Sequence, residues 1–179
     1  MDGQHRRAAL AGLAYIFLDF EASSLSKQSY PIEVGWVGED GNGEAHLIHP
    51  APGWTEWDER AAAIHGITRA ELERDGEPHE IVCARLLSRF EQNIVLASAP
   101  SWDGHWLSML LRATGRPRHL VRLQDTEVAF VSAAQAKGGD VAAIVASARA
   151  RIEATPVGHR ALGDARREWA IWRAIVEGS

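Results

Sequence analysis

Residues 13–20, LAYIFLDF, form an apolar run that is broken only by Asp19 near its end. Both alternating faces of a strand built from these residues would be largely apolar. This pattern is typical of a central strand that helices cover on each side. The run therefore predicts the middle strand of an α/β sheet.

The residues before this run allow a different interpretation. His5, Arg6 and Arg7 precede an apolar stretch over residues 8–18, as in a secretory signal. The stretch passes directly into Asp19, however, without a small-residue cleavage pattern, and it is too short to span a bilayer. We therefore expect a buried strand and no membrane partner.

The rest of the chain shows further strand and helix signals. Asp-Gly and Asn-Gly pairs in residues 38–43 predict a hairpin between strands at 32–37 and 45–48. Strands are also predicted at 94–98 and 120–123. Helices are predicted from about residue 58 to a left-handed cap at 66, from a capping box at 68–71, and over 78–92, 104–112, 125–136, 141–153 and 160–176. The last helix would carry Leu162, Ala165, Trp169, Trp172 and Val176 on one side. This order predicts a mixed α/β sheet with helices on both faces.

Length and charge limit the number of domains and the kinds of partner. The chain has 179 residues and no internal repeat, so we expect a single domain over 1–179. A formal net charge of −5 argues against a protein that holds nucleic acid through a large basic surface, because such binding comes from neutralised phosphates. The single cysteine, Cys83, permits a reducing compartment, and we expect a cytoplasmic location.

Two carboxylates meet at the end of the predicted central strand. Asp19 and Glu21 are two residues apart, so on a strand they point to the same face. Ionised carboxylates placed there repel each other and lose solvation, which favours a hard cation such as Mg²⁺ or Mn²⁺ between them. The alternative is that the strand ends at Asp19 and that both groups face water.

A third carboxylate, Asp103, follows the predicted strand at 94–98 and begins a helix. Ligands of open α/β sheets bind at the carboxyl ends of strands, which favours a functional role. The alternative is an N-cap, for which Asp is among the preferred residues.

His159 and Asp164 are five residues apart near the end of the chain. On one continuous helix they would point about 140° apart and would not share a site. Pro156 and Gly158 interrupt the chain just before His159, so we expect the histidine in a loop and Asp164 on the helix. The alternative for Asp164 is a local ion pair with Arg167.

Taken together, Asp19-x-Glu21, Asp103 and His159-x₄-Asp164 resemble the DEDDh branch of the DnaQ-like 3′-to-5′ exonucleases, relatives of RNase T, oligoribonuclease and polymerase proofreading domains. The segment His65-Gly66-Ile67-Thr68 resembles a second recurring motif of that family. The resemblance extends over residues 13–175. It departs from the commonest pattern after Glu21, where Ala22-Ser23-Ser24-Leu25 stands in place of two threonines and a glycine before the leucine.

The resemblance implies a ribonuclease H-like fold and a specific chemistry. It implies hydrolysis at the 3′ end of short single-stranded nucleic acid, with release of nucleoside 5′-monophosphates and the use of two Mg²⁺ or Mn²⁺ ions. Its implied ion ligands are Asp19 (shared), Glu21, Asp103 and Asp164, and His159 would deprotonate the attacking water. Its implied pocket for the 3′-terminal nucleotide contains Ala22, Leu25 and His65. Small relatives commonly dimerise, so a homodimer is also expected.

Two other functions stay open at this point. A phosphodiesterase for dinucleotides or nucleotide conjugates would use the same groups, and a non-catalytic nucleic-acid-binding module would need none of them. The choice between RNA and DNA depends on contacts to the 2′-hydroxyl, which motif spacing does not reveal.

Overall fold

The computed structural model describes residues 13–154 and 158–178, and within them six strands form one mixed sheet. The strands lie in the order β4-β3-β2-β1-β5-β6, with β2 antiparallel to β1 and β3, and with the pairs β1/β5, β5/β6 and β3/β4 parallel. Their bounds are β1 (Tyr15–Ala22), β2 (Pro31–Gly38), β3 (Gly43–His49), β4 (Glu77–Pro78), β5 (Ile94–Ala97) and β6 (Gln124–Asp125). The run at residues 13–20 is thus the central strand, as predicted.

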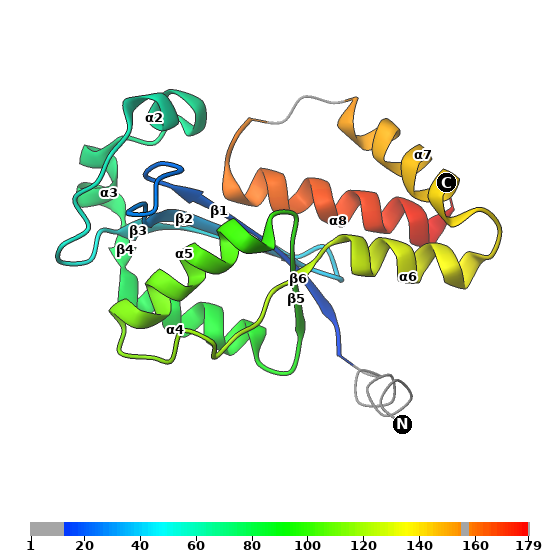
Figure 1. The fold of residues 1–179 in the computed structure, drawn as a ribbon, viewed down its shortest axis with the longest axis horizontal. Helices are drawn as coiled ribbons and strands as arrows, with labels where there is room; N and C mark the ends of the chain where they lie inside the picture. The colour runs from blue at the N-terminus through cyan, green and yellow to red at the C-terminus, as the bar shows by residue number, and fades with distance from the viewer. Residues whose placement is uncertain (1–12, 155–157, 179) are drawn as a thin grey trace.

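Helices cover both faces of this sheet (Figure 1). The helices of the described residues are α2 (Glu59–His65), α3 (Arg69–Asp75), α4 (His79–Phe90), α5 (Pro100–Ala113), α6 (Glu127–Lys137), α7 (Val141–Glu153) and α8 (Ala161–Glu177). Helices α4 and α5 pack on one face, and α6, α7 and α8 pack on the other. This layering confirms the predicted α/β fold.

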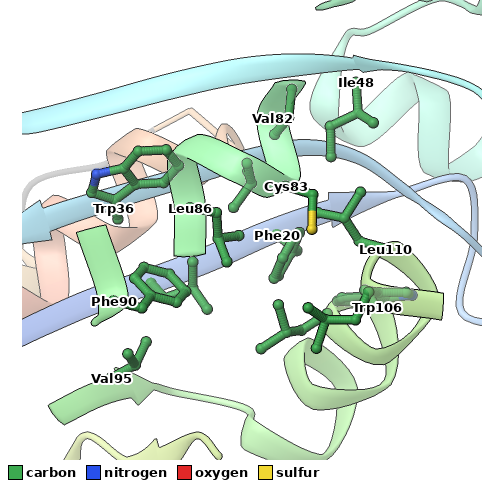
Figure 2. Packing of buried hydrophobic residues seen from close by; sticks show 14 of the residues in the cluster. Phe20, Trp36, Ile48, Val82, Cys83, Leu86, Phe90, Val95, Trp106 and Leu110 are labelled. Atoms are coloured by element: carbon green, nitrogen blue, oxygen red, sulfur yellow. The ribbon is translucent and has the colours of Figure 1, made fainter. Parts of the chain in front are cut away.

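Alternation along β1 divides its side chains between the two faces. Ile16, Leu18 and Phe20 belong to the core under α4 and α5, which Figure 2 shows around Phe20 and Cys83. Phe17 belongs to the second core, under α6, α7 and α8. Residues 19 and 21 continue the alternation of Phe17, so they lie on the α8 face of the sheet.

The predicted hairpin and helix caps are present. The turn between β2 and β3 closes through the Gly38 amide, which donates to the Asn42 carbonyl at 2.9 Å. Asp58 caps α2, and Gly66 ends that helix with φ 71°, a left-handed conformation that suits glycine. Thr68 and Glu71 form the capping box of α3.

Two predicted features are wrong. Residues 120–123 are not a strand; Val121 and Leu123 pack against the core beneath α4 and α5, and the short pairing with β5 comes later, at Gln124–Asp125. On α8, Val176 is 43% exposed, and the fully buried side chains are Ala161, Ala165, Ile171 and Ile175. Hydrophobicity alone does not distinguish a covering loop from a paired strand.

Within the described residues, no single helix is long and apolar enough to cross a membrane. Helices α6 and α7 pass that test only as a pair, and the chain bends by 119° between them.

Candidate active site

The site begins where β1 extends beyond its parallel neighbour. The last residue of β5, Ala97, pairs with Leu18, so from Asp19 onward β1 has a strand partner only on its β2 side. Asp19 and Glu21 therefore project at the carboxyl end of the central strand, where open α/β sheets place their ligands. A register shift between Glu21 and Ala22 marks the end of regular pairing.

Helix α8 brings a third carboxylate to this edge. One carboxylate oxygen each from Asp19, Glu21 and Asp164 lies within 4.8 Å of the other two, a spacing that could hold a metal ion. Asp164 lies in the first turn of α8. The close approach of α8 to the sheet depends on Gly35 in β2, because a Cβ at that position would overlap the backbone of Ala161 and Leu162.

Asp103 reaches the same edge from the opposite face. It lies in the first turn of α5, it is 1% exposed, and its Oδ1 accepts a hydrogen bond from the Phe20 amide at 3.2 Å. This hydrogen bond replaces the strand-to-strand hydrogen bond that β5 would have formed with β1 if it extended this far. The N-cap interpretation is wrong, because the cap residue is Ala99 and Pro100 begins the helix.

Burial raises the pKa of each site carboxylate, and neighbouring carboxylates raise the pKa of Asp19 and Glu21 further. Burial is the main cause of the high pKa of Asp19, and the charges of Asp103, Asp164 and Glu21 add to it. Burial, Asp164 and Glu33 raise the pKa of Glu21 to about 7. Burial also raises the pKa of Asp103 to about 7, against the hydrogen bond from Phe20. A divalent cation would offset this crowding, so the donor set fits a hard metal ion.

Asp164 takes part in both arrangements considered from the sequence. Its Oδ1 accepts from Nη1 of Arg167 at 2.5 Å, which is the local i,i+3 pair. The same carboxylate also lies beside Asp19 and Glu21. Burial raises its pKa, while Arg167 and His159 act in the opposite direction.

His159 lies at the entrance to α8 and is exposed. Its charge lowers the pKa of Asp164, which lies in the first turn of the helix that follows it. The expected loop position of His159 is observed, whereas Pro156 falls outside the described residues.

The residues expected to contact the 3′-terminal nucleotide lie in two segments, 22–25 and the end of α2. Ala22 is buried and Leu25 is 71% exposed, and the segment between them is held by Glu56, which accepts from the hydroxyls of Ser23 at 2.7 Å and Ser24 at 2.5 Å. His65 ends α2 and is buried. Its Nδ1 accepts from the Ile67 amide at 3.1 Å, and its Nε2 has no hydrogen-bond partner among the described residues.

Burial lowers the pKa of His65, and the charges of Glu33 and Arg160 also act on it. His65 is the last residue of α2, directly before the left-handed cap at Gly66.

Sequence reasoning missed two acidic residues beside the site. Glu168 lies one turn after Asp164, accepts from the Thr126 hydroxyl at 2.7 Å and adds to the high pKa of Asp19. Its i,i+4 spacing from Asp164 was the available signal. Glu33 lies opposite Glu21 in the β1–β2 ladder, and its signal was a charged residue within an otherwise apolar strand.

Solved structures of exonuclease I share this fold. The apo structure of exonuclease I superposes with a TM-score of 0.67 at 17% identity, covering 93% of this chain and 42% of that one. E. coli exonuclease I in complex with a dT13 oligonucleotide gives 0.66 at 16% identity, covering 90% and 41%. The zinc-bound complex of the E. coli enzyme with single-stranded DNA gives 0.64 at 17%, covering 89% and 39%.

The chain spans about two-fifths of the length of these structures. No protein-family model and no curated protein matches its sequence. At this level of identity the likeness shows the fold alone, and that fold agrees with the α/β architecture that the sequence predicted.

Proposed function

We propose that this chain is a metal-dependent 3′-to-5′ exonuclease that hydrolyses the terminal phosphodiester of short single-stranded nucleic acid and releases nucleoside 5′-monophosphates. The observation that carries the proposal is the convergence of Asp19, Glu21 and Asp164 within 4.8 Å, with buried Asp103 hydrogen-bonded to the adjoining strand. These carboxylates come from three elements far apart in the sequence, and their mutual repulsion is unfavourable unless a cation is bound.

The donor set suits two Mg²⁺ or Mn²⁺ ions. Asp19 is central in the cluster and would be shared, Glu21 and Asp164 would complete the first site, and Asp103 would serve the second, partly through water. When bound, such ions stabilise charge on the attacking and leaving oxygens of a phosphoryl transfer.

His159 supplies the proton acceptor in this proposal. It is exposed at the entrance to α8, and its charge lowers the pKa of Asp164. From there its ring would take a proton from the attacking water. Ala22, Leu25 and His65 would contact the 3′-terminal nucleotide in this proposal.

The structural neighbours support the class of substrate. They include exonuclease I bound to single-stranded DNA and to a dT13 oligonucleotide. For this chain we propose a single-stranded oligonucleotide partner, a single domain over 1–179 and a homodimer. Buried, unpaired Cys83 is compatible with the cytoplasmic location that we propose.

The test is a side-by-side assay of 5′-labelled short RNA, short DNA and dinucleotides with Mg²⁺, with Mn²⁺ and with chelator. We expect metal-dependent ladders that shorten from the 3′ end, and 5′-mononucleotides as product. Turnover of dinucleotides alone would favour the phosphodiesterase, and strand binding without turnover in either metal would overturn the proposal in favour of a binding module.

A further inference from the structure

The buried carboxylate of Glu33 is held by the start of α8. Glu33 is 2% exposed, and its two oxygens accept from Nε of Arg160 at 3.1 and 3.0 Å and from Nη2 of Arg160 at 2.5 Å. Its Oε2 also accepts from the Ala161 amide at 3.0 Å. A carboxylate this deeply buried is tolerated only when it is fully paired, and a guanidinium fork is the strongest such partner. These contacts fix the first residues of α8 to β2.

Helix α8 lacks a capping side chain of its own. Its N-cap residue is Arg160, which makes no side-chain hydrogen bond to the first-turn amides. Glu33 supplies the missing acceptor from a distant strand, and its negative charge is favourable at a helix N-terminus. The position of the first turn of α8 is therefore set by β2.

The residues of β2 that hold α8 lie opposite the site carboxylates. In the β1–β2 ladder Glu33 pairs with Glu21, and Gly35, against which the start of α8 packs, pairs with Asp19. One strand thus fixes α8 relative to both carboxylates of β1. The backbone of Asp164 follows, because its amide donates to the Arg160 carbonyl at 3.0 Å.

His159 depends on this attachment more than Asp164 does. It directly precedes Arg160, it is exposed, and its ring makes no hydrogen bond or ion pair within residues 13–154 and 158–178. Asp164 has a further support, because α8 also packs through its buried face. Loss of the Arg160 contact would therefore release His159 first.

We propose that Glu33 and Arg160 form a clamp that positions His159 beside the carboxylate cluster. The inference rests on the proposed function, in which His159 accepts the proton. Glu33 and Arg160 are positioning residues, because they act through His159 and do not touch the reacting atoms. Exposed ion pairs contribute little to a structure, but this pair differs in having one fully buried, doubly hydrogen-bonded partner.

The central variant is the double substitution Glu33→Gln with Arg160→Met. Removing Arg160 alone would leave a buried, unpaired carboxylate and could unfold the protein. Glutamine avoids that charge and still offers Ala161 an acceptor, so the double variant removes the ion pair while retaining the cap. Arg173→Met is the matched control, since Arg173 lies on the same helix in an exposed ion pair with Glu177.

The first readout does not depend on turnover. Mn²⁺ bound at the carboxylates broadens the NMR signals of nearby nuclei with a steep distance dependence, so it reports how close the His159 ring lies to the site. We expect strong broadening in the parent and in Arg173→Met, and weak broadening in the double variant. Mn²⁺ affinity by calorimetry and the urea midpoint should remain close to the parent values.

The second readout separates positioning from binding. In the double variant kcat should fall by roughly 10- to 100-fold, as for other residues that orient an active group, with KM unchanged. Arg160→Lys keeps the charge but not the planar fork, so its kcat should lie between those of the parent and the double variant.

The outcomes distinguish the two proposals. Unchanged broadening and kcat in a folded, Mn²⁺-binding double variant would overturn the clamp and leave the exonuclease proposal standing. A matching fall in stability, Mn²⁺ affinity and kcat would also overturn it, because the pair would then be merely structural. Absence of Mn²⁺ binding in the parent would instead remove the proposed function, and the clamp with it.

Discussion

Asp19 is the residue at which the electrostatics of the site converge. It lies at the end of the central strand, and the carboxylates of Asp103, Asp164 and Glu21 all raise its pKa. These three carboxylates come from different parts of the chain. The close approach of each one to Asp19 is favourable only if Asp19 is neutral or bound to a cation. In the metal-free folded protein the charge of Asp19 is therefore repelled by its neighbours, and a neutral substitution at this position removes that repulsion.

Asp19→Asn tests this conclusion. We expect turnover to fall by more than about 100-fold, because removing a direct ligand should cost more than removing its supports. We expect the free energy of unfolding in chelator to stay equal or rise, since a repelled carboxylate is replaced by a neutral amide of the same shape. Turnover and urea unfolding are the measurements, with exposed Glu91→Gln as the control; near-parental turnover would contradict the metal assignment.

His159→Ala tests the proton acceptor. General-base contributions are typically of the order of 10² to 10⁴, so turnover should fall by that factor. Mn²⁺ affinity should change little, because the carboxylates set it. The matched control is His119→Ala, an exposed histidine outside the site; turnover equal to that of the parent would exclude His159 from the reaction.

The sequence was sufficient to predict the site residues, but not the pair that holds the start of α8. Two-residue spacing on a strand was enough to place Asp19 and Glu21 on one face, and a chain-breaking segment before His159 was enough to separate it from Asp164. The clamp could not be predicted, because residues 33 and 160 meet only through the packing of α8 on β2. Spacing encodes local geometry, whereas contacts between distant elements depend on the tertiary fold.

At the scale of elements, the site is formed where strands and helices end. The last residue of β5 pairs with Leu18, four residues before the end of β1. Helix α5 begins nearby, and its Asp103 accepts a hydrogen bond from the part of the β1 backbone that has no β5 partner. The β2–β3 hairpin, the Gly66 cap of α2 and the capping box of α3 followed from turn and capping signals, whereas the order of the strands in the sheet was not predicted. The failure at residues 120–123 shows the limit, because an apolar run does not distinguish a paired strand from a loop that packs on the core.

Gly35→Ala tests how closely α8 must approach the sheet. The added Cβ would overlap the backbone of Ala161 and Leu162, which cannot move aside as a flexible side chain can. We expect a loss of about 1–3 kcal/mol in the free energy of unfolding, together with weaker Mn²⁺ binding as Asp164 moves away from Asp19. Gly104→Ala in α5 is the control, because its Cβ meets nothing within 4 Å, and it should be neutral or stabilising. Equal stability of the two variants would show that α8 adapts to the extra atom.

At the scale of the whole molecule, the carboxylate cluster predicts how stability depends on pH. The folded-state pKa values of Glu21 and Asp103 are about 7, against ordinary values of 4.5 and 3.8. The folded protein then binds more protons than the unfolded chain between about pH 4 and 7, so this contribution to stability is complete below that window and is lost as pH rises through it. Urea unfolding in chelator should show the decline, and Mn²⁺ should reduce it. A contribution that grows from pH 4 to 7 in chelator and is unaffected by Asp19→Asn would contradict the role assigned to these groups.

The same large-scale charge distribution predicts which strands are cut. The chain carries a net charge of −5, so its hold on a strand should come mainly from contacts at the edge that holds the carboxylates rather than from a long basic surface. A circular single strand offers no 3′ end to that edge and should remain intact, whereas the same sequence in linear form should shorten from its 3′ end. Binding should also weaken only slightly with added salt, because few phosphates are neutralised. Gel analysis of the circular and linear forms under identical metal conditions decides the matter, since cleavage of the circle would identify an endonuclease.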